Sequence, residues 1–202
     1  MSTGGQAGVL ITENTALIIL AEDILTRVNQ ITNRGLSSID TELSEVLIEI
    51  SRRTLCLKET DTDNTVAAQN YIDKPADMVN DEIFGLVVDE VVYKPISWPD
   101  FLNGVGYGYC VFGDKIYFTP THSDAKAYTL YYPRVHPVEV TTIYIPGVYK
   151  EAVIHLTCAK IYHQYNLYDD EKVELDLYER EISNLSGHSR TPPVCKPYKG
   201  LF

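Results

Sequence analysis

The sequence is poor in the features that mark a metal, redox or membrane protein. Its four cysteines lie far apart, so it has no C-x-x-C motif. The longest apolar run, 16–21, is too short to span a bilayer. The first residues lack a basic stretch followed by an apolar one, so no signal peptide is expected. These absences predict a soluble protein with reduced thiols and no membrane contact.

Basic residues are also scarce. The chain of 202 residues has 17 lysines and arginines against 28 acidic residues, and its net charge is −11. A protein that grips the nucleic-acid backbone needs Lys and Arg on its binding face, so this mode of binding is disfavoured. This excess of acidic residues fits an acidic protein that is merely soluble, or a protein with a surface along which a polyanion slides without binding.

Motifs for catalysis or metal binding are missing too. The alternating glycines of 103–108 precede neither a helix start nor a Lys-Ser/Thr pair, so they do not form a phosphate loop. His155 and His163 lie eight residues apart, too far to share a metal on one helix. The stretch 61–64 resembles the start of a calcium loop but lacks its glycine and closing glutamate, so we expect a solvated turn. We predict no enzyme activity, no cofactor and no metal site.

Helical periodicity marks two pairs of segments. The first pair follows residue 12, with a break near Gly35, and both of its helices have one apolar face. The helix after Pro146 is apolar on two sides, which predicts that it lies between neighbours. A second helix, capped by Asp169 or Asp170, is expected to end at Gly187. Short connections make each pair an antiparallel hairpin.

Between the helical pairs the pattern changes to short runs of β-branched and aromatic residues separated by turn signals. The clearest is a hairpin whose turn dipeptide is Gly113-Asp114. Ser97 is expected to cap a single helical turn, followed by a flexible glycine-rich loop at 103–108. The strands are predicted at 55–59, 65–73, 82–86, 90–94, 109–112, 115–119 and 127–132.

The predicted fold is therefore α+β: a four-helix bundle of two helical pairs, with a small antiparallel β-region inserted and with extended termini. The predicted parts are an N-terminal arm (1–11), a helical domain (12–54 and 146–186), a β-rich insertion (55–145) and an extended C-terminal tail (187–202).

Tyrosine is abundant: fifteen residues, against five Phe and one Trp. Tyrosine combines an apolar face with a polar tip and is enriched at protein interfaces, although a glycan-binding platform would also use it. The tail has three prolines together with Tyr198 and Phe202. This composition is typical of a tail that docks onto another chain. A frayed terminus is an equally good interpretation of the same composition.

Several stretches, in this order, resemble the head–tail adaptor (connector) proteins of tailed bacteriophages, and most closely those of short-tailed phages, including the tail tubular proteins. They are YIDKPADM at 71–78, the strand pair 115–120 and 127–133, the helix entry IPGVYKEAV at 145–153, and the helical return 162–185. The likeness covers most of 12–186. The glycine-rich loop and the tail follow no family pattern.

The resemblance implies a non-enzymatic subunit of the virion neck, assembled in the host cytoplasm. Such adaptors form a ring, commonly of twelve copies, that joins the portal protein to the tail or next neck ring. Genomic DNA passes through the lumen without specific binding, and a negative lumen would keep it from sticking. The alternatives are a glycan-binding or other tail interaction module, and a hydrolase with dispersed Asp and His residues.

Three sets of interaction residues are predicted on this basis. The apolar second side of the helix after Pro146 is expected to meet a neighbouring copy, and the glycine-rich loop and the turn 121–124 are expected to make axial contacts. The tail aromatics are expected to dock onto another chain. The residues are Ile154, Cys158 and Tyr165; Asn103, Gly104, Gly106 and Gly108; and Tyr198 and Phe202.

Overall fold

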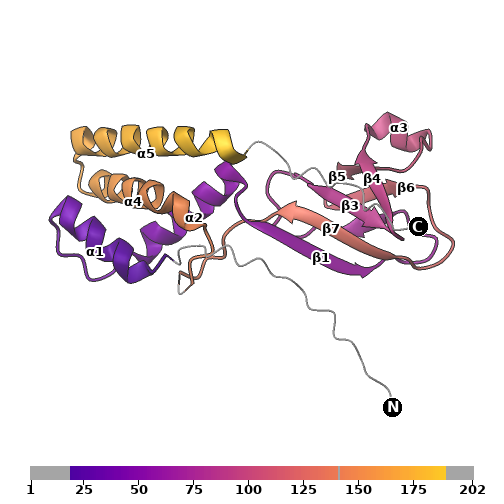
Figure 1. Ribbon diagram of the computed structural model, residues 1–202, viewed down its shortest axis with the longest axis horizontal. Coiled ribbons are helices and arrows are strands. Elements are labelled where there is room, and N and C mark those ends of the chain that lie inside the picture. Colours follow the sequence, from indigo (N-terminus) through magenta and orange to yellow (C-terminus); the bar gives the residue numbers. More distant parts are fainter. Residues whose placement is uncertain (1–18, 141, 190–202) are drawn as a thin grey trace, which may run out of the picture.

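The computed structural model describes residues 19–140 and 142–189 (Figure 1). Its helices are α1 (Ala21–Thr32), α2 (Asp40–Thr54), α3 (Trp98–Leu102), α4 (Lys150–Gln164) and α5 (Tyr168–Ser189), with a 3-10 turn η1 (Gly147–Tyr149). Its strands are β1 (Lys58–Asn64), β2 (Tyr71–Asp73), β3 (Gly85–Val88), β4 (Val91–Pro95), β5 (Gly108–Phe112), β6 (Lys115–Thr119) and β7 (Ala127–Pro133).

Helix α4 is the centre of the helical part. It contacts α1, α2 and α5, and both of its apolar sides are buried, including Val153, Ile154 and Cys158. This explains the two-sided pattern in the sequence, because each side packs on a different neighbour of the same chain. At the surface, Arg53 of α2 donates a hydrogen bond to Glu179 of α5 at 2.6 Å and so connects the two helices.

Helix α5 differs from its prediction at both ends. It begins at Tyr168, where the Glu171 amide donates to the Leu167 carbonyl at 2.9 Å, so Asp169 and Asp170 lie inside the first turn and do not cap it. There their charges suit the positive end of the helix dipole. The helix also continues through Gly187 to Ser189, because one glycine costs a helix only about 1 kcal/mol.

The strands form one seven-stranded sheet in the order β1-β7-β3-β4-β5-β6-β2. The expected turn at 61–64 is wrong: these residues belong to β1, which pairs in antiparallel register with the whole of β7. Alternating threonines at 60 and 62 favour a strand, and the long partner outweighs the turn preference of Asp and Asn. The predicted hairpin through Gly113-Asp114 is confirmed as β5–β6.

The predicted fold class is wrong. Residues 19–140 and 142–189 form five helices and a curled, mixed sheet that makes a half-barrel, rather than a four-helix bundle with a small antiparallel insertion. Strand β5 runs parallel to the end of β4, because α3 and its loop return the chain to Lys94 and Pro95, which pair with Gly108 and Tyr109. The sheet also encloses its own apolar core, which includes Leu86, Phe118 and Leu130. Local periodicity did not reveal that the short strands join in one curled layer.

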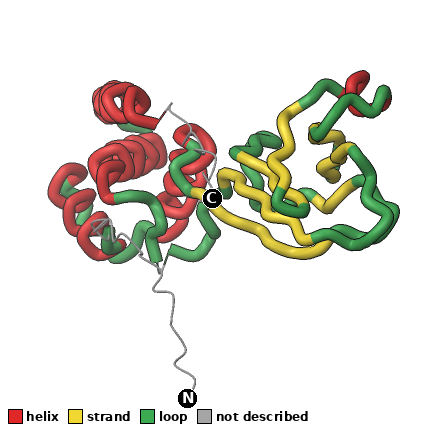
Figure 2. Tube along the Cα trace, turned by 45° about the vertical axis from the view of Figure 1, so that its right-hand side comes forward, coloured by secondary structure: helices red, strands yellow, loops and turns green. Residues whose placement is uncertain are grey.

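The helices and the sheet lie at opposite ends of the molecule, and α3 stands on the sheet side (Figures 1 and 2). Between the two cores lies His136, of which only 1% is exposed. Its backbone amide donates to Ser51 of α2 at 3.0 Å, and its ring bonds to the backbone of Pro137 and Tyr144. This histidine therefore joins the segment after β7 to the helical core.

Candidate functional site

Several exposed apolar side chains of the described chain lie in α3 and in the segments next to it. Trp98 stacks on Phe101 at 5.1 Å between ring centres and on Phe112 of β5 at 4.7 Å, and it meets Tyr117 of β6 edge-on at 5.2 Å. Ser97 accepts a hydrogen bond from the Asp100 amide, which confirms the predicted cap of this helical turn. The aromatic stack thus fixes α3 on the β5–β6 hairpin.

Around this stack, large apolar side chains point to solvent: Leu102 (66% exposed), Val105 (52%), Tyr107 (54%) and Phe112 (59%). We call these four residues, with Trp98 and Phe101, the α3 surface. Apolar residues gathered at one end of a molecule, rather than scattered singly, mark an interaction site. In Figure 1, α3 lies at the end of the molecule opposite α1, α4 and α5.

The glycine-rich loop predicted to make axial contacts belongs to the same surface. Gly104 and Gly106 have positive φ angles of 66° and 62°, and the Val105 amide donates to the Asp100 carbonyl at 3.1 Å. Asn103 is the C-terminal cap of α3. Gly108 lies in β5, where an added Cβ would come within 2.6 Å of Ile96. The loop is thus a turn that these hydrogen bonds hold against α3.

The other predicted contact residues lie in different surroundings. Ile154 and Cys158 are 1% and 0% exposed inside the helical core, so their neighbours are helices of the same chain. Tyr165, just after α4, is 46% exposed and stacks under the Arg34 guanidinium at 4.3 Å. A contact with a second copy through this end of α4 stays a prediction. Tyr198 and Phe202 lie outside the described residues.

The buried polar groups serve packing. His155 of α4 and Glu174 of α5 are both largely buried and pair at 2.7 Å. Burial raises the pKa of Cys158 to about 12, which keeps this thiol protonated and unreactive. Within 19–140 and 142–189, no three His, Cys, Asp or Glu side chains gather as metal ligands. In the same described ranges, no helix is long and apolar enough to cross a bilayer.

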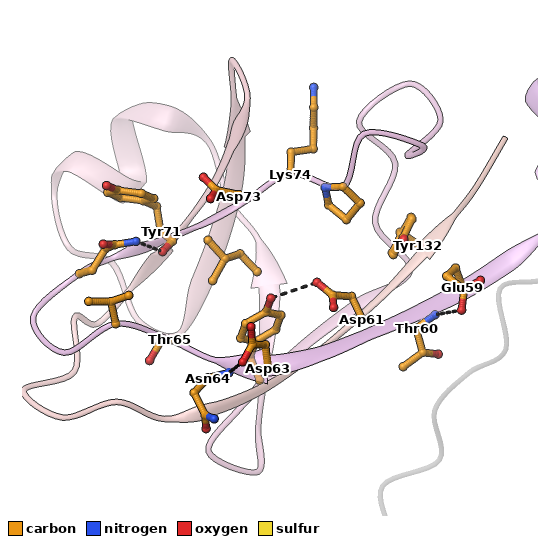
Figure 3. Close-up of a pocket in the computed structure, with 15 residues that line it drawn as sticks. Glu59, Thr60, Asp61, Asp63, Asn64, Thr65, Tyr71, Asp73, Lys74 and Tyr132 are labelled. Carbon is orange, nitrogen blue, oxygen red and sulfur yellow. Dashed lines mark hydrogen bonds between the residues drawn. The ribbon is translucent and has the colours of Figure 1, made fainter.

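A second distinctive site lies where the two edge strands of the sheet, β1 and β2, face each other (Figure 3). The cavity there has a volume of about 630 Å³. Glu59, Asp61 and Asp63 of β1 and Asp73 of β2 line it, and we call it the acidic cleft. Sequence reasoning missed it, although the alternation of acidic residues and threonines in 59–63 was the available signal.

Two tyrosines of β7 join the acidic cleft to the sheet core. The Tyr128 hydroxyl donates to Asp61 at 3.0 Å, and the Tyr132 hydroxyl donates to Asp77 at 3.1 Å. Burial, together with the neighbouring carboxylates, raises the pKa of both phenols, so both stay protonated donors. Of the cleft carboxylates, Asp61 is therefore held in place by a tyrosine of the sheet core.

The two distinctive sites of the described residues are thus the exposed apolar surface beside α3 and the acidic cleft between the edge strands. Residues 16–196 match the sequence profile of the SU10 adaptor protein family. The chain belongs to this family, as the predicted resemblance to phage adaptors implied. The family supports a structural role in the neck of a phage virion, next to portal and tail components. The chain has no significant match among curated proteins.

Proposed function

We propose that copies of this chain form a ring, with twelve copies as the expected number, that joins the portal to the tail and lets DNA pass. The proposal extends the adaptor role of the family. The observation that carries it is the α3 surface. Its four strongly exposed apolar side chains are removed from water only when a partner covers them, and this burial favours binding. In this arrangement the α3 surface contacts an axial neighbour.

The charge of the helical part supports DNA passage. Helix α5 has seven acidic residues against Lys172 and Arg180: Asp169, Asp170, Glu171, Glu174, Asp176, Glu179 and Glu181. Apart from Glu174 these side chains are at least partly exposed. If α5 lines the lumen, its carboxylates repel the phosphates of the passing DNA, so the genome slides without binding.

A glycan-binding role is less well supported. Sugar recognition needs an open aromatic face, and Trp98 is stacked by Phe101 and Phe112 of its own chain. The two exposed aromatics beside it, Tyr107 and Phe112, also serve as contacts for a protein partner.

The test is a phage whose chain carries Leu102→Asp and Val105→Asp. Both side chains are exposed, so the variant should fold and enter the neck ring, while virions with attached tails should fall at least tenfold in electron micrographs. Val138→Asp, an equally exposed apolar position outside the α3 surface, is the matched control and should leave tails attached. Normal tail attachment in the double variant would overturn the axial role of this surface.

A further inference from the structure

The two edge strands of the half-barrel, β1 and β2, face each other across the acidic cleft. β1 pairs only with β7, and β2 pairs only with β6, so each presents one unpaired side in the described part of the chain. Unpaired strand edges are sites where an extended segment adds through main-chain hydrogen bonds. The acidic cleft occupies the space between these edges (Figure 3).

The edge of β1 is occupied by its own side chains. The Thr60 amide donates to the Glu59 carboxylate at 3.2 Å, and the Asn64 amide donates to the Asp63 carboxylate at 2.7 Å. These are contacts between adjacent residues, which an incoming carbonyl group can replace. The outer amides of β1 are therefore available to an added strand.

The charge of the acidic cleft is only partly neutralised. Asp73 pairs with Lys115 at 2.8 Å, and Glu59 pairs with Arg134 at 2.8 Å. Within the described ranges, Asp61 and Asp63 make no salt bridge. An occupant that suits the cleft is therefore an extended segment with positive charges.

The chain itself contains such a segment. Residues 190–202 read RTPPVCKPYKGLF, with Arg190, Lys196 and Lys199 and no acidic residue, in a protein whose net charge is −11. The segment follows directly after α5, and thirteen residues in extended form reach about 43 Å. From residue 194 onward its one proline, Pro197, leaves every amide on one side of a strand free to pair.

We propose that the C-terminal segment 190–202 of this chain, from the same or a neighbouring copy, docks in the acidic cleft against the edge of β1. Its basic residues neutralise Asp61 and Asp63, and its backbone extends the sheet. The inference does not depend on ring formation, because the cleft and the segment belong to every copy.

The native Cys195 provides the test in the full-length chain. Asn64→Cys places an exposed thiol at the end of β1, beside the acidic cleft, and Asn184→Cys places one on α5, closer to the segment in sequence. Under mild oxidation at low salt, the Asn64→Cys chain should form a disulfide at least tenfold faster than the Asn184→Cys chain. Adding Cys195→Ser should abolish that product, and circular dichroism checks that each variant is folded.

Charge dependence completes the test. Asp61→Asn with Asp63→Asn in the Asn64→Cys chain should slow cross-linking at least fivefold, as should 0.5 M salt. A cross-linked monomer or a cross-linked dimer on a non-reducing gel would each support the docking and show which copy supplies the segment. Equal rates for Asn64→Cys and Asn184→Cys, or a rate that is insensitive to these charges, would overturn it.

Discussion

At the residue scale, His136 shows how one buried side chain makes the junction between the two cores sensitive to pH. Its Nδ1 lies 2.7 Å from the Pro137 carbonyl and so donates, while its Nε2 accepts from the Tyr144 amide at 3.1 Å. Burial lowers the pKa of this ring; its bond to Pro137 opposes the shift and Arg134 adds to it. The neutral ring satisfies both bonds, whereas a proton on Nε2 would face the Tyr144 amide.

The folded pKa of His136 lies below the unfolded value of about 6.5. Its contribution to stability is therefore complete above that value and is lost as the pH falls through the folded pKa. We predict that the free energy of unfolding falls between pH 7.5 and pH 5, and that His136→Gln reduces this slope. The measurement is urea unfolding at both pH values. An unchanged slope in the variant would contradict the assignment.

The glycines of the α3 loop allow a prediction that separates crowding from backbone strain. Gly108→Ala should cost about 1–3 kcal/mol, because its Cβ would lie 2.6 Å from an Ile96 methyl group. Gly106→Ala should cost about 1 kcal/mol, because its φ is positive although nothing lies within 4 Å.

Ile96→Ala distinguishes the two causes. Added to Gly108→Ala it should recover part of the lost stability, and added to Gly106→Ala it should recover none. Thermal unfolding of the single and double variants gives both coupling energies. Equal coupling at the two positions would show that close packing is not the reason for glycine at 108.

At the element scale, the helices were the most predictable part of the chain. The two-sided apolar pattern after Pro146 correctly indicated a buried α4. A helix that packs on several sides has apolar residues on several faces, and this pattern is visible in a single sequence. The ends of α5 were mispredicted, since an Asp pair and a glycine are weak local signals that a helix packed along its length overrides.

The sheet was less predictable, and the candidate sites follow from it. Residues 61–64 of β1 looked like a turn because their pairing partner, β7, lies over sixty residues away. The acidic cleft depends on which strands become the edges, and this order is set by long-range pairing. For the α3 surface, the glycines marked a loop at 103–108, whose contacts stay a prediction, but the exposure of Phe112 and Leu102 follows from the packing of α3 on the hairpin.

Two predicted contact residues, Ile154 near the start of α4 and Tyr165 just after its end, give a prediction about assembly. Ile154→Asp should unfold the chain, since it puts a charge in a core position that is 1% exposed. Tyr165→Asp should leave the fold intact and weaken contacts between copies, because this side chain is exposed. Circular dichroism reports the fold, and native mass spectrometry reports the oligomer. An unchanged oligomer with Tyr165→Asp would exclude this end of α4 from the ring contact.

At the scale of the whole molecule, the helices and the sheet present different surfaces at opposite ends. The helical end has an acidic outer face on α5, and the sheet end has the apolar α3 surface and the acidic cleft. Such a separation suits a ring subunit, in which one part meets identical neighbours and the passing DNA while another part meets a different protein. The family assignment and this polarity together support the adaptor role.

The central claim, a ring in the virion neck, is tested most directly by cryo-electron microscopy of the neck in virions that contain this chain. The account predicts a closed ring of copies between portal and tail, about 270 kDa for twelve copies of the 22.8 kDa chain, with α3 against the axial neighbour. Density that places the chain outside the neck, or as single copies without a closed ring, would contradict the account.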